Sequence, residues 1–273
     1  MSARRIANLV RRLWRSVTTR RPLGRLLWIG AAIVLVWAGA WLVTSDRREA
    51  QIVRGDPDAI PAQIKLMNFA AARGADVFNA QCASCHGADG KGSPARGVPD
   101  LSDADWLYGG GKVKDIEKVA YYGIRAHNPR GWSLAFMPAF ARPVPATGER
   151  LQPLSPGEIE AVIAYLQSRA GHPADPATAE AGRAIYSGKG GCYDCHANDA
   201  KGDPAIGAPN LVDKIWLYGD GSRRAIFDSI AYGRQGVCPA QAGRLSALRL
   251  REVSLYVFAL SHRPGQHSDT SRP

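Results

Sequence analysis

The motif Cys82-Ala83-Ser84-Cys85-His86 returns 110 residues later as Cys192-Tyr193-Asp194-Cys195-His196. The same offset carries Trp106-Leu107-Tyr108-Gly109 onto Trp216-Leu217-Tyr218-Gly219, and Tyr122-Gly123 onto Tyr232-Gly233. After about 19 extra residues in the first copy, Met137-Pro138-Ala139 corresponds to Cys238-Pro239-Ala240 and Leu154-Ser155 corresponds to Leu245-Ser246. Self-similarity at a fixed offset predicts two copies of one domain.

The spacing Cys-x-x-Cys-His is the attachment signature of c-type haem in an exported protein. Two thiols three positions apart can reach the two vinyl groups of one haem, and the adjacent histidine can bind its iron. The sequence therefore predicts two covalently bound haem c groups, attached at Cys82 and Cys85 and at Cys192 and Cys195. His86 and His196 are the predicted iron ligands. Two disulfides would leave the histidines unexplained, and zinc sites would need further paired ligands.

The sixth ligand of the first haem is predicted to be Met137, because a thioether opposite histidine suits an electron carrier. The methionine could instead be a core residue. Met67 lies upstream of the first motif in an apolar stripe and is better explained as core. His127, in the extra residues of the first copy, would give a bis-histidine site instead.

The second copy has Cys238 where the first has methionine, and no methionine follows residue 137. We therefore expect His196 and Cys238 to ligate the second haem, with sulfur bound as thiolate, because a metal lowers the pKa of a thiol. Two alternatives stay open at this point. The position opposite His196 could be vacant or hold water, or a lysine or a histidine such as His262 or His267 could replace the cysteine.

The secondary structure is predicted to be all-α, with Gly- and Pro-rich loops between helices. Helices are expected over 68–79 and 177–187, after Asp115 and Arg223, and after the capping serines Ser155 and Ser246. The prolines of the segment 171–176 separate the two copies. The predicted organisation is a linker at 44–66, cytochrome c domains at 67–170 and 177–263, and a tail at 264–273.

The basic charge of the chain is concentrated at its N-terminus. The 273 residues carry a net charge of +11, but residues 1–25 contain eight arginines and no acid. The rest has 27 basic against 24 acidic residues, which argues against nucleic-acid binding. An uncharged run over 26–43 predicts a transmembrane helix, with the arm 1–25 in the cytoplasm and the haem domains outside. A signal peptide cleaved near Ala38-Gly39-Ala40 is the alternative.

The paired haem motifs, the two Trp-Leu-Tyr-Gly stretches and Met137-Pro138-Ala139-Phe140 resemble the dihaem subunit III of cbb3-type cytochrome c oxidases. The resemblance covers roughly residues 55–263 and implies an anchor in the bacterial inner membrane followed by two periplasmic class I cytochrome c domains. It also implies an electron-transfer subunit that is no enzyme on its own. The implied partners are the monohaem cytochrome c subunit and the haem–copper catalytic subunit, with soluble cytochrome c or quinol–cytochrome c reductase as donor.

This sequence departs from the family's pattern at Cys238, where the family has methionine, and before the anchor, where the family's Asn-Pro-Leu-Pro and Trp-Trp residues are missing. Two other functions stay open: a stand-alone anchored carrier or redox sensor, and a thiosulfate dehydrogenase-like dihaem enzyme. Trp106 and Trp216 are expected to pack against haem. Arg125 and Arg234 follow the equivalent Tyr-Gly pairs and could neutralise haem propionates or lie on a solvated face.

Overall fold

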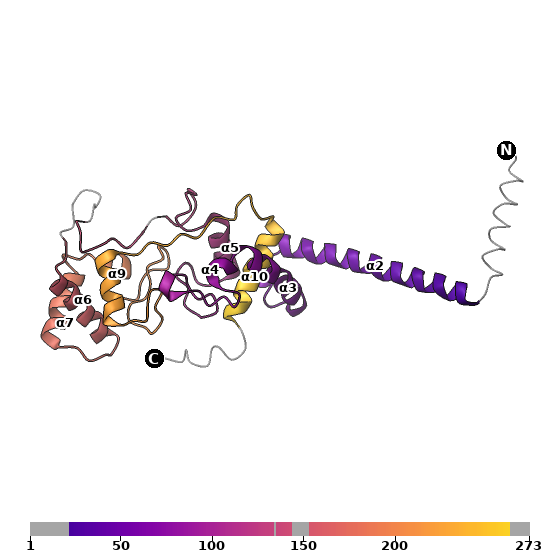
Figure 1. The fold of residues 1–273 in the computed structure, drawn as a ribbon. Coiled ribbons are helices and arrows are strands. Elements are labelled where there is room, and N and C mark those ends of the chain that lie inside the picture. The colour runs from indigo at the N-terminus through magenta and orange to yellow at the C-terminus, as the bar shows by residue number, and fades with distance from the viewer. Residues whose placement is uncertain (1–21, 134, 144–152, 263–273) are drawn as a thin grey trace, which may run out of the picture. The chain divides into compact units, whose positions relative to one another are not determined.

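The computed structural model describes residues 22–133, 135–143 and 153–262, which fold into helices and loops. Within these ranges the only β-structure is a set of isolated bridges, so the predicted all-α class is confirmed. The chain divides into two units at Arg54, and each unit is described by itself. The elements in chain order (Figure 1) are α2 (Pro22–Arg54), η1 (Pro57–Ala59), α3 (Ile64–Gln81), α4 (Ala83–His86), η2 (Pro94–Arg96), α5 (Val113–Tyr122), α6 (Pro156–Arg169), α7 (Pro176–Tyr186), α8 (Tyr193–His196), α9 (Arg223–Tyr232) and α10 (Ala247–Ser261).

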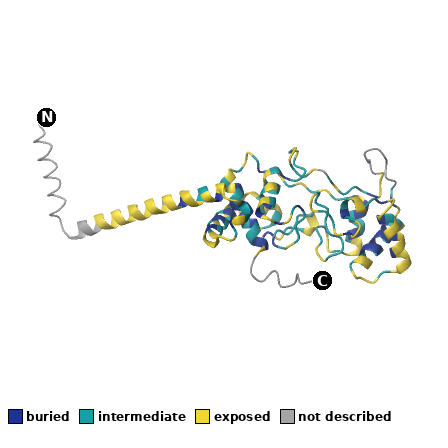
Figure 2. Cartoon of the chain, turned by 180° about the vertical axis from the view of Figure 1, so that it is seen from behind, coloured by how far each residue is buried: buried dark blue, intermediate teal, exposed yellow. Residues whose placement is uncertain are grey.

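The described part of the first unit is α2, which is long and apolar enough from Trp28 to Arg54 to cross a membrane. Its large side chains, including Trp28, Trp37 and Trp41, are exposed, as the yellow length of this helix in Figure 2 shows. A helix with an exposed apolar surface of this length is stable in lipid rather than in water. The helix continues past the predicted end at residue 43, into the segment expected to be a linker.

The two serine caps predicted from the sequence are confirmed in the second unit, whereas α3 begins at Ile64 rather than at residue 68 and α5 begins at Val113, before Asp115. Ser155 caps α6 in a capping box, because its side chain accepts from the Glu158 N–H while the Glu158 carboxylate accepts from the Ser155 N–H. Ser246 accepts from the Arg249 N–H at the start of α10. Such caps satisfy backbone donors that the first turn of a helix leaves without partners.

The helices of this unit form two groups that do not follow the order of the repeat. The last helix, α10, packs against α3 and α5, whereas α6 packs against α7 and α9. Figure 1 shows both groups, with yellow α10 beside indigo-to-purple α3. We name the group that holds the first motif the Cys82 half (residues 55–124 and 238–262). The group that holds the second motif is the Cys192 half (residues 137–234).

Each half has its own apolar core, built on a close crossing of two helices. A Cβ atom added to Gly74 of α3 would lie 2.1 Å from the Glu252 carbonyl oxygen of α10. In the other half, a Cβ atom on Gly182 of α7 would lie 1.9 Å from the Ala161 carbonyl oxygen of α6. An aromatic pair stands beside each crossing, with ring centroids 5.2 Å apart in both halves: Phe78 with Tyr256, and Tyr165 with Tyr186.

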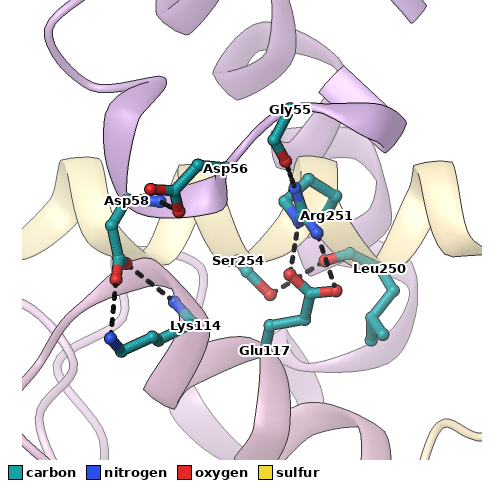
Figure 3. A network of polar contacts seen from close by, with 8 residues as sticks. All are labelled: Gly55, Asp56, Asp58, Lys114, Glu117, Leu250, Arg251 and Ser254. Atoms are coloured by element: carbon teal, nitrogen blue, oxygen red, sulfur yellow. Dashed lines mark hydrogen bonds and ion pairs between the residues drawn. The ribbon is translucent and has the colours of Figure 1, made fainter. Parts of the chain in front are cut away.

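Ion pairs tie α10 to the Cys82 half. Arg251 of α10 pairs with Glu117 of α5 and also donates to the Gly55 carbonyl at 3.2 Å (Figure 3). Lys114, at the start of α5, pairs with Asp58 at 3.3 Å. The fully buried Glu252 of α10 pairs with Arg73 of α3. The contacts of Arg251 and Glu252 hold α10 on the half that contains the first haem motif, and the Lys114–Asp58 pair joins α5 to η1 within that half.

The two halves meet through contacts that obey the same 110-residue offset as the sequence repeat. Gly109 donates its N–H to the Pro204 carbonyl and Gly219 donates to the Pro94 carbonyl, both at 3.1 Å. The Tyr108 ring lies against Gly207, and the Tyr218 ring lies against Gly97, where a Cβ atom would overlap the ring. The interface is therefore pseudo-symmetric.

The predicted boundary at residues 170–177 does not match this packing. The repeat assigned α6 to the first domain and α10 to the second, but each helix packs in the opposite half. The chain leaves the Cys82 half after residue 124 and returns to it between residues 234 and 238. The terminal helices of the two copies are thus exchanged.

Candidate haem sites

Both cysteine motifs form a single helical turn, which follows α3 directly in the first motif and follows residues 187–192 after α7 in the second. Cys82 is both the C-cap of α3 and the N-cap of α4, and the His86 N–H donates to the Cys82 carbonyl at 3.0 Å. In the second motif the His196 N–H donates to the Cys192 carbonyl at 2.9 Å. Because residues three apart lie on one face of a helical turn, each pair of thiols is presented on the same side. This is the arrangement that attachment of one haem requires.

Both histidines are held by a proline carbonyl. Nδ1 of His86 lies 3.2 Å from the Pro99 carbonyl oxygen, and Nδ1 of His196 lies 3.0 Å from that of Pro209. A carbonyl oxygen can only accept, so Nδ1 must carry the proton and Nε2 keeps its lone pair for a metal. Burial lowers the pKa of both histidines, which favours the neutral, ligating form.

The cysteines are free thiols. No disulfide joins any of the five, and among residues 22–133, 135–143 and 153–262 no three His, Cys, Asp or Glu side chains form a group able to hold a metal ion. Burial raises the pKa of Cys82 and of Cys192 to about 11, so both thiols are neutral. A neutral thiol beside a neutral imidazole fits an apolar, vinyl-bearing ligand.

An apolar cavity opens beside the second motif, and its chemistry fits haem. Cys192, Cys195 and His196 line it from α8 and the residue that precedes α8. Met137 lines the same cavity and packs against the core of the Cys192 half. The remaining wall is mainly apolar and includes Phe140, Val162, Leu166, Tyr186, Leu211, Trp216, Ile226 and Ile230. Two thiols, an imidazole and a thioether around one apolar space are the donor set of a His/Met haem c site.

Cys238 lies near the thiols of the first motif. Burial first, and then the nearby Cys85, raises the pKa of the Cys238 thiol, and Cys238 in turn adds to the burial that raises the pKa of Cys82. Its backbone pairs with Ile124, directly after α5: each N–H donates to the other carbonyl, at 2.9 and 3.0 Å. The third thiol therefore lies in the Cys82 half with His86.

The predicted pairing of distal ligands is therefore exchanged in the structure. The sequence paired Met137 with His86 and Cys238 with His196, but Met137 lies in the cavity of His196 and Cys238 lies near the thiols beside His86. The reason is the chain path, because Met137 pairs with Arg234, directly after α9. Each distal residue thus follows its terminal helix into the opposite half.

The other predicted residues are accounted for as follows. Trp216 lines the cavity, and Trp106 packs beside the core of the Cys82 half, each with its ring against a glycine. His127 is exposed, and the exposed His262 stacks on Phe258 with centroids 3.8 Å apart. Residues 1–21 of the predicted arm 1–25, the tail 264–273 and His267 lie outside the described residues.

Sequence reasoning missed the two carbonyls that orient the histidines. The signal was present, because the 110-residue offset carries Pro99 onto Pro209. Arg125 was predicted to neutralise a haem propionate or to lie on a solvated face, and its contacts with both distal segments were not predicted.

Comparison with known proteins identifies relatives of this chain. A family model described as cytochrome c matches residues 71–170. The chain is 34% identical to the cbb3-type cytochrome c oxidase subunit FixP of Bradyrhizobium sp. (strain ORS 278), over 88% of this chain and 89% of the relative. It is 39% identical to the subunit CcoP of Rhodobacter capsulatus, over 78% and 69%. It is 38% identical to the subunit FixPc of Rhizobium leguminosarum bv. viciae, over 74% and 64%.

Proposed function

The chain belongs to the family of cbb3-type cytochrome c oxidase subunits named FixP and CcoP, and from this premise we propose that it binds two haem c groups and relays electrons between them. The cytochrome c electron-transfer role in the oxidase follows from the family. The chain is an electron-carrying subunit and no enzyme on its own. A second haem is supported by the second motif and the apolar cavity beside it.

The proposed ligands differ between the two sites. When bound, haem c would supply a one-electron iron couple. Cys82 and Cys85 would anchor the first group, and His86 and Cys238 would ligate its iron. Cys192 and Cys195 would anchor the second, and His196 and Met137 would ligate its iron. The placement of Met137 and Cys238 supports this assignment.

A thiolate and a thioether set different reduction potentials. A thiolate donates charge to iron and favours the ferric state, whereas methionine favours the ferrous state. Axial ligation spans roughly 0.8 V among haem proteins, so a separation of about 200 mV between the two sites is well within range. That separation would make reduction of the Cys238 site about 4.6 kcal/mol less favourable than reduction of the Met137 site, at roughly 2.3 kcal/mol per 100 mV.

The route of electrons follows from the family and the anchor. We assign α2 to the bacterial inner membrane as a single span, with the N-terminal arm in the cytoplasm and the haem-binding halves in the periplasm. The donor is a soluble cytochrome c or a quinol–cytochrome c reductase. The acceptors are the monohaem cytochrome c subunit and then the haem–copper subunit of the oxidase.

The observation that carries this proposal is the pair of Cys-x-x-Cys-His turns, each with its histidine oriented by a proline carbonyl. Purification from membranes in mild detergent tests it. We expect the chain to stain for haem, to carry two haems per chain and to co-purify with a haem–copper subunit. A single haem, or turnover of thiosulfate by the purified chain without an oxidase, would contradict the proposal.

Substitution Cys238→Met tests the thiolate. We expect the variant to lose the thiolate-ligated ferric haem signal in electron paramagnetic resonance (EPR) and one of its two potentials to rise by about 200 mV. Cys238→Ser, which removes the sulfur and adds no thioether, is the matched control. Persistence of the thiolate signal in both variants would show that Cys238 is not a ligand.

A further inference from the structure

We propose that Arg125 is a positioning residue shared by both haem sites, whose single guanidinium holds the two distal-ligand segments in place. This inference rests on the ligation proposed above, because it names the group that keeps Met137 and Cys238 where they lie. Arg125 follows α5 and is the first residue beyond the bridge of Ile124 with Cys238. At this residue the chain begins to cross from the Cys82 half to the Cys192 half.

The guanidinium contacts equivalent positions of both distal segments. Nε donates to the Gly236 carbonyl at 2.5 Å, and Nη1 donates to the Ala135 carbonyl at 2.8 Å. Gly236 stands two residues before Cys238, and Ala135 stands two residues before Met137. The planar fork of arginine can hold two acceptors in fixed directions at once, which a lysine ammonium does less well.

The backbone and side chain of Arg125 are both constrained by these contacts. Its φ of 50° is in the left-handed region, which is unfavourable for a residue with a Cβ atom. The surrounding structure must therefore hold it, since such conformations persist only where neighbouring contacts over-determine them. The Arg125 N–H donates to the Trp132 carbonyl at 2.8 Å, and Nη1 also donates to the buried Tyr108 hydroxyl at 3.2 Å.

The charge of Arg125 enters a haem site. Its side chain is half-buried and lines the cavity that holds His196 and Met137. The acceptors described above are neutral oxygens, so they orient the cation without neutralising it. A positive charge beside a redox site stabilises the state that has gained an electron. Arg125 should therefore also raise the reduction potential there.

Arg125 has no equivalent arginine in the second copy; Arg234, which also lines the cavity, donates Nε to the Ser229 hydroxyl and lies over the Tyr218 ring. The equivalent position in the second copy is Gln235, which is exposed. One fork thus serves two pseudo-symmetric distal segments, and loss of Arg125 should disturb both sites together. A residue that only stabilised one loop would disturb one.

The test uses the full chain purified from membranes, with two substitutions and two controls. Arg125→Gln removes the charge and the fork, and Arg125→Lys keeps the charge alone. Arg130→Gln removes the same charge from an exposed side chain of the same crossover, and Gln235→Ala alters the equivalent position of the other copy. The readouts are the thiolate-ligated haem signal in EPR, the near-infrared charge-transfer band of methionine-ligated ferric haem, and both reduction potentials.

We expect Arg125→Gln to weaken both ligand signals together and to lower the potential of the methionine-ligated haem, with both controls unchanged in ligand signals. Arg125→Lys should weaken both ligand signals while keeping more of the potential. If Arg125→Gln fails to accumulate, the lysine variant decides by the same two signals. Unchanged signals, or loss of one signal alone, would overturn the shared role. Absence of the thiolate or methionine signal from the unsubstituted protein would overturn the ligation itself, which is a distinguishable result.

Discussion

Two sulfur-bearing side chains distinguish the two proposed haem sites, which share the positions of their histidine, proline and tryptophan residues. Both histidines are oriented by a proline carbonyl, both motifs form one helical turn, and both sites have a tryptophan packed on a glycine. What differs is the thioether of Met137 and the thiol of Cys238. The proposed iron ligands thus differ in this one residue pair, and in which half each member lies.

Asp103 offers a pH-dependent test of the interface between the halves. Burial and the charges of Asp100, Asp105 and Asp213 raise the pKa of Asp103 to about 7. An unfolded aspartate titrates near 3.9, so the folded protein holds a proton that the unfolded chain releases between about pH 4 and pH 7. Stability from this group is full below pH 4 and is lost as pH rises to 7.

We expect Asp103→Asn to raise the melting temperature at pH 8 and to leave it nearly unchanged at pH 4. Asparagine is neutral at both pH values and can still accept from the Asp105 N–H, as Asp103 does at 3.0 Å. Thermal unfolding of the detergent-solubilised protein at the two pH values measures this. An equal shift at both would contradict the raised pKa.

At the scale of elements, the helices could be predicted but their partners could not. Capping serines and apolar spacing located α6 and α10, since these signals are local. The terminal helices α10 and α6 make nearly equivalent crossings, α10 at Gly74 of α3 and α6 at Gly182 of α7. These local contacts therefore hardly distinguish the observed pairing of helices from the pairing that the repeat predicts.

An ion pair favours the packing of α10 on α3, which the sequence repeat does not predict. The buried Glu252 of α10 pairs with Arg73 of α3. When the helices are aligned at their crossings, Gly74 with Gly182, the position that corresponds to Glu252 is Ala161 of α6 and the position that corresponds to Arg73 is Ala181 of α7. A buried carboxylate without a cation is costly, so this pair favours α10 on α3.

The crossing of α6 and α7 gives a prediction at this scale. We expect Gly182→Ala to destabilise the protein by about 1–3 kcal/mol, because the added methyl meets the Ala161 backbone, which cannot move without separating the helices. Gly157→Ala, at a helical glycine of α6 with nothing within 4 Å of an added Cβ atom, is the matched control and should be neutral or stabilising. Chemical denaturation measures both, and equal stabilities of the two variants would refute the close crossing.

At the scale of the whole molecule, the Cys192 half is one continuous stretch inserted between two parts of the Cys82 half. The crossovers lie at residues 124–137 and 234–238. Met137 and α6 therefore precede the second motif in the chain, whereas Cys238 and α10 arrive last. The Cys82 half is complete only when the C-terminal helix has been added.

Truncation of the chain after Gly236 tests this chain path. We expect the shortened chain to lose the thiolate-ligated haem, because it lacks Cys238 and α10, and to keep the methionine-ligated haem of the Cys192 half. If the chain were instead divided in the order of the repeat, the truncation would remove the distal residue and the last helix of the second domain. The haem at Cys192 and Cys195 would then be lost and the haem at Cys82 and Cys85 would remain. Haem staining together with the near-infrared band of the purified variant decides between them.

The exchange of distal ligands is tested most directly by two variants, each of which removes the cysteines of one haem motif. The measurement is the identity of the distal ligand of the haem that remains. In the variant Cys192→Ser/Cys195→Ser, the remaining haem at Cys82 and Cys85 should give the thiolate signal in EPR. In Cys82→Ser/Cys85→Ser, the remaining haem should show the methionine charge-transfer band. Methionine ligation in the first variant, or thiolate ligation in the second, would contradict the exchange.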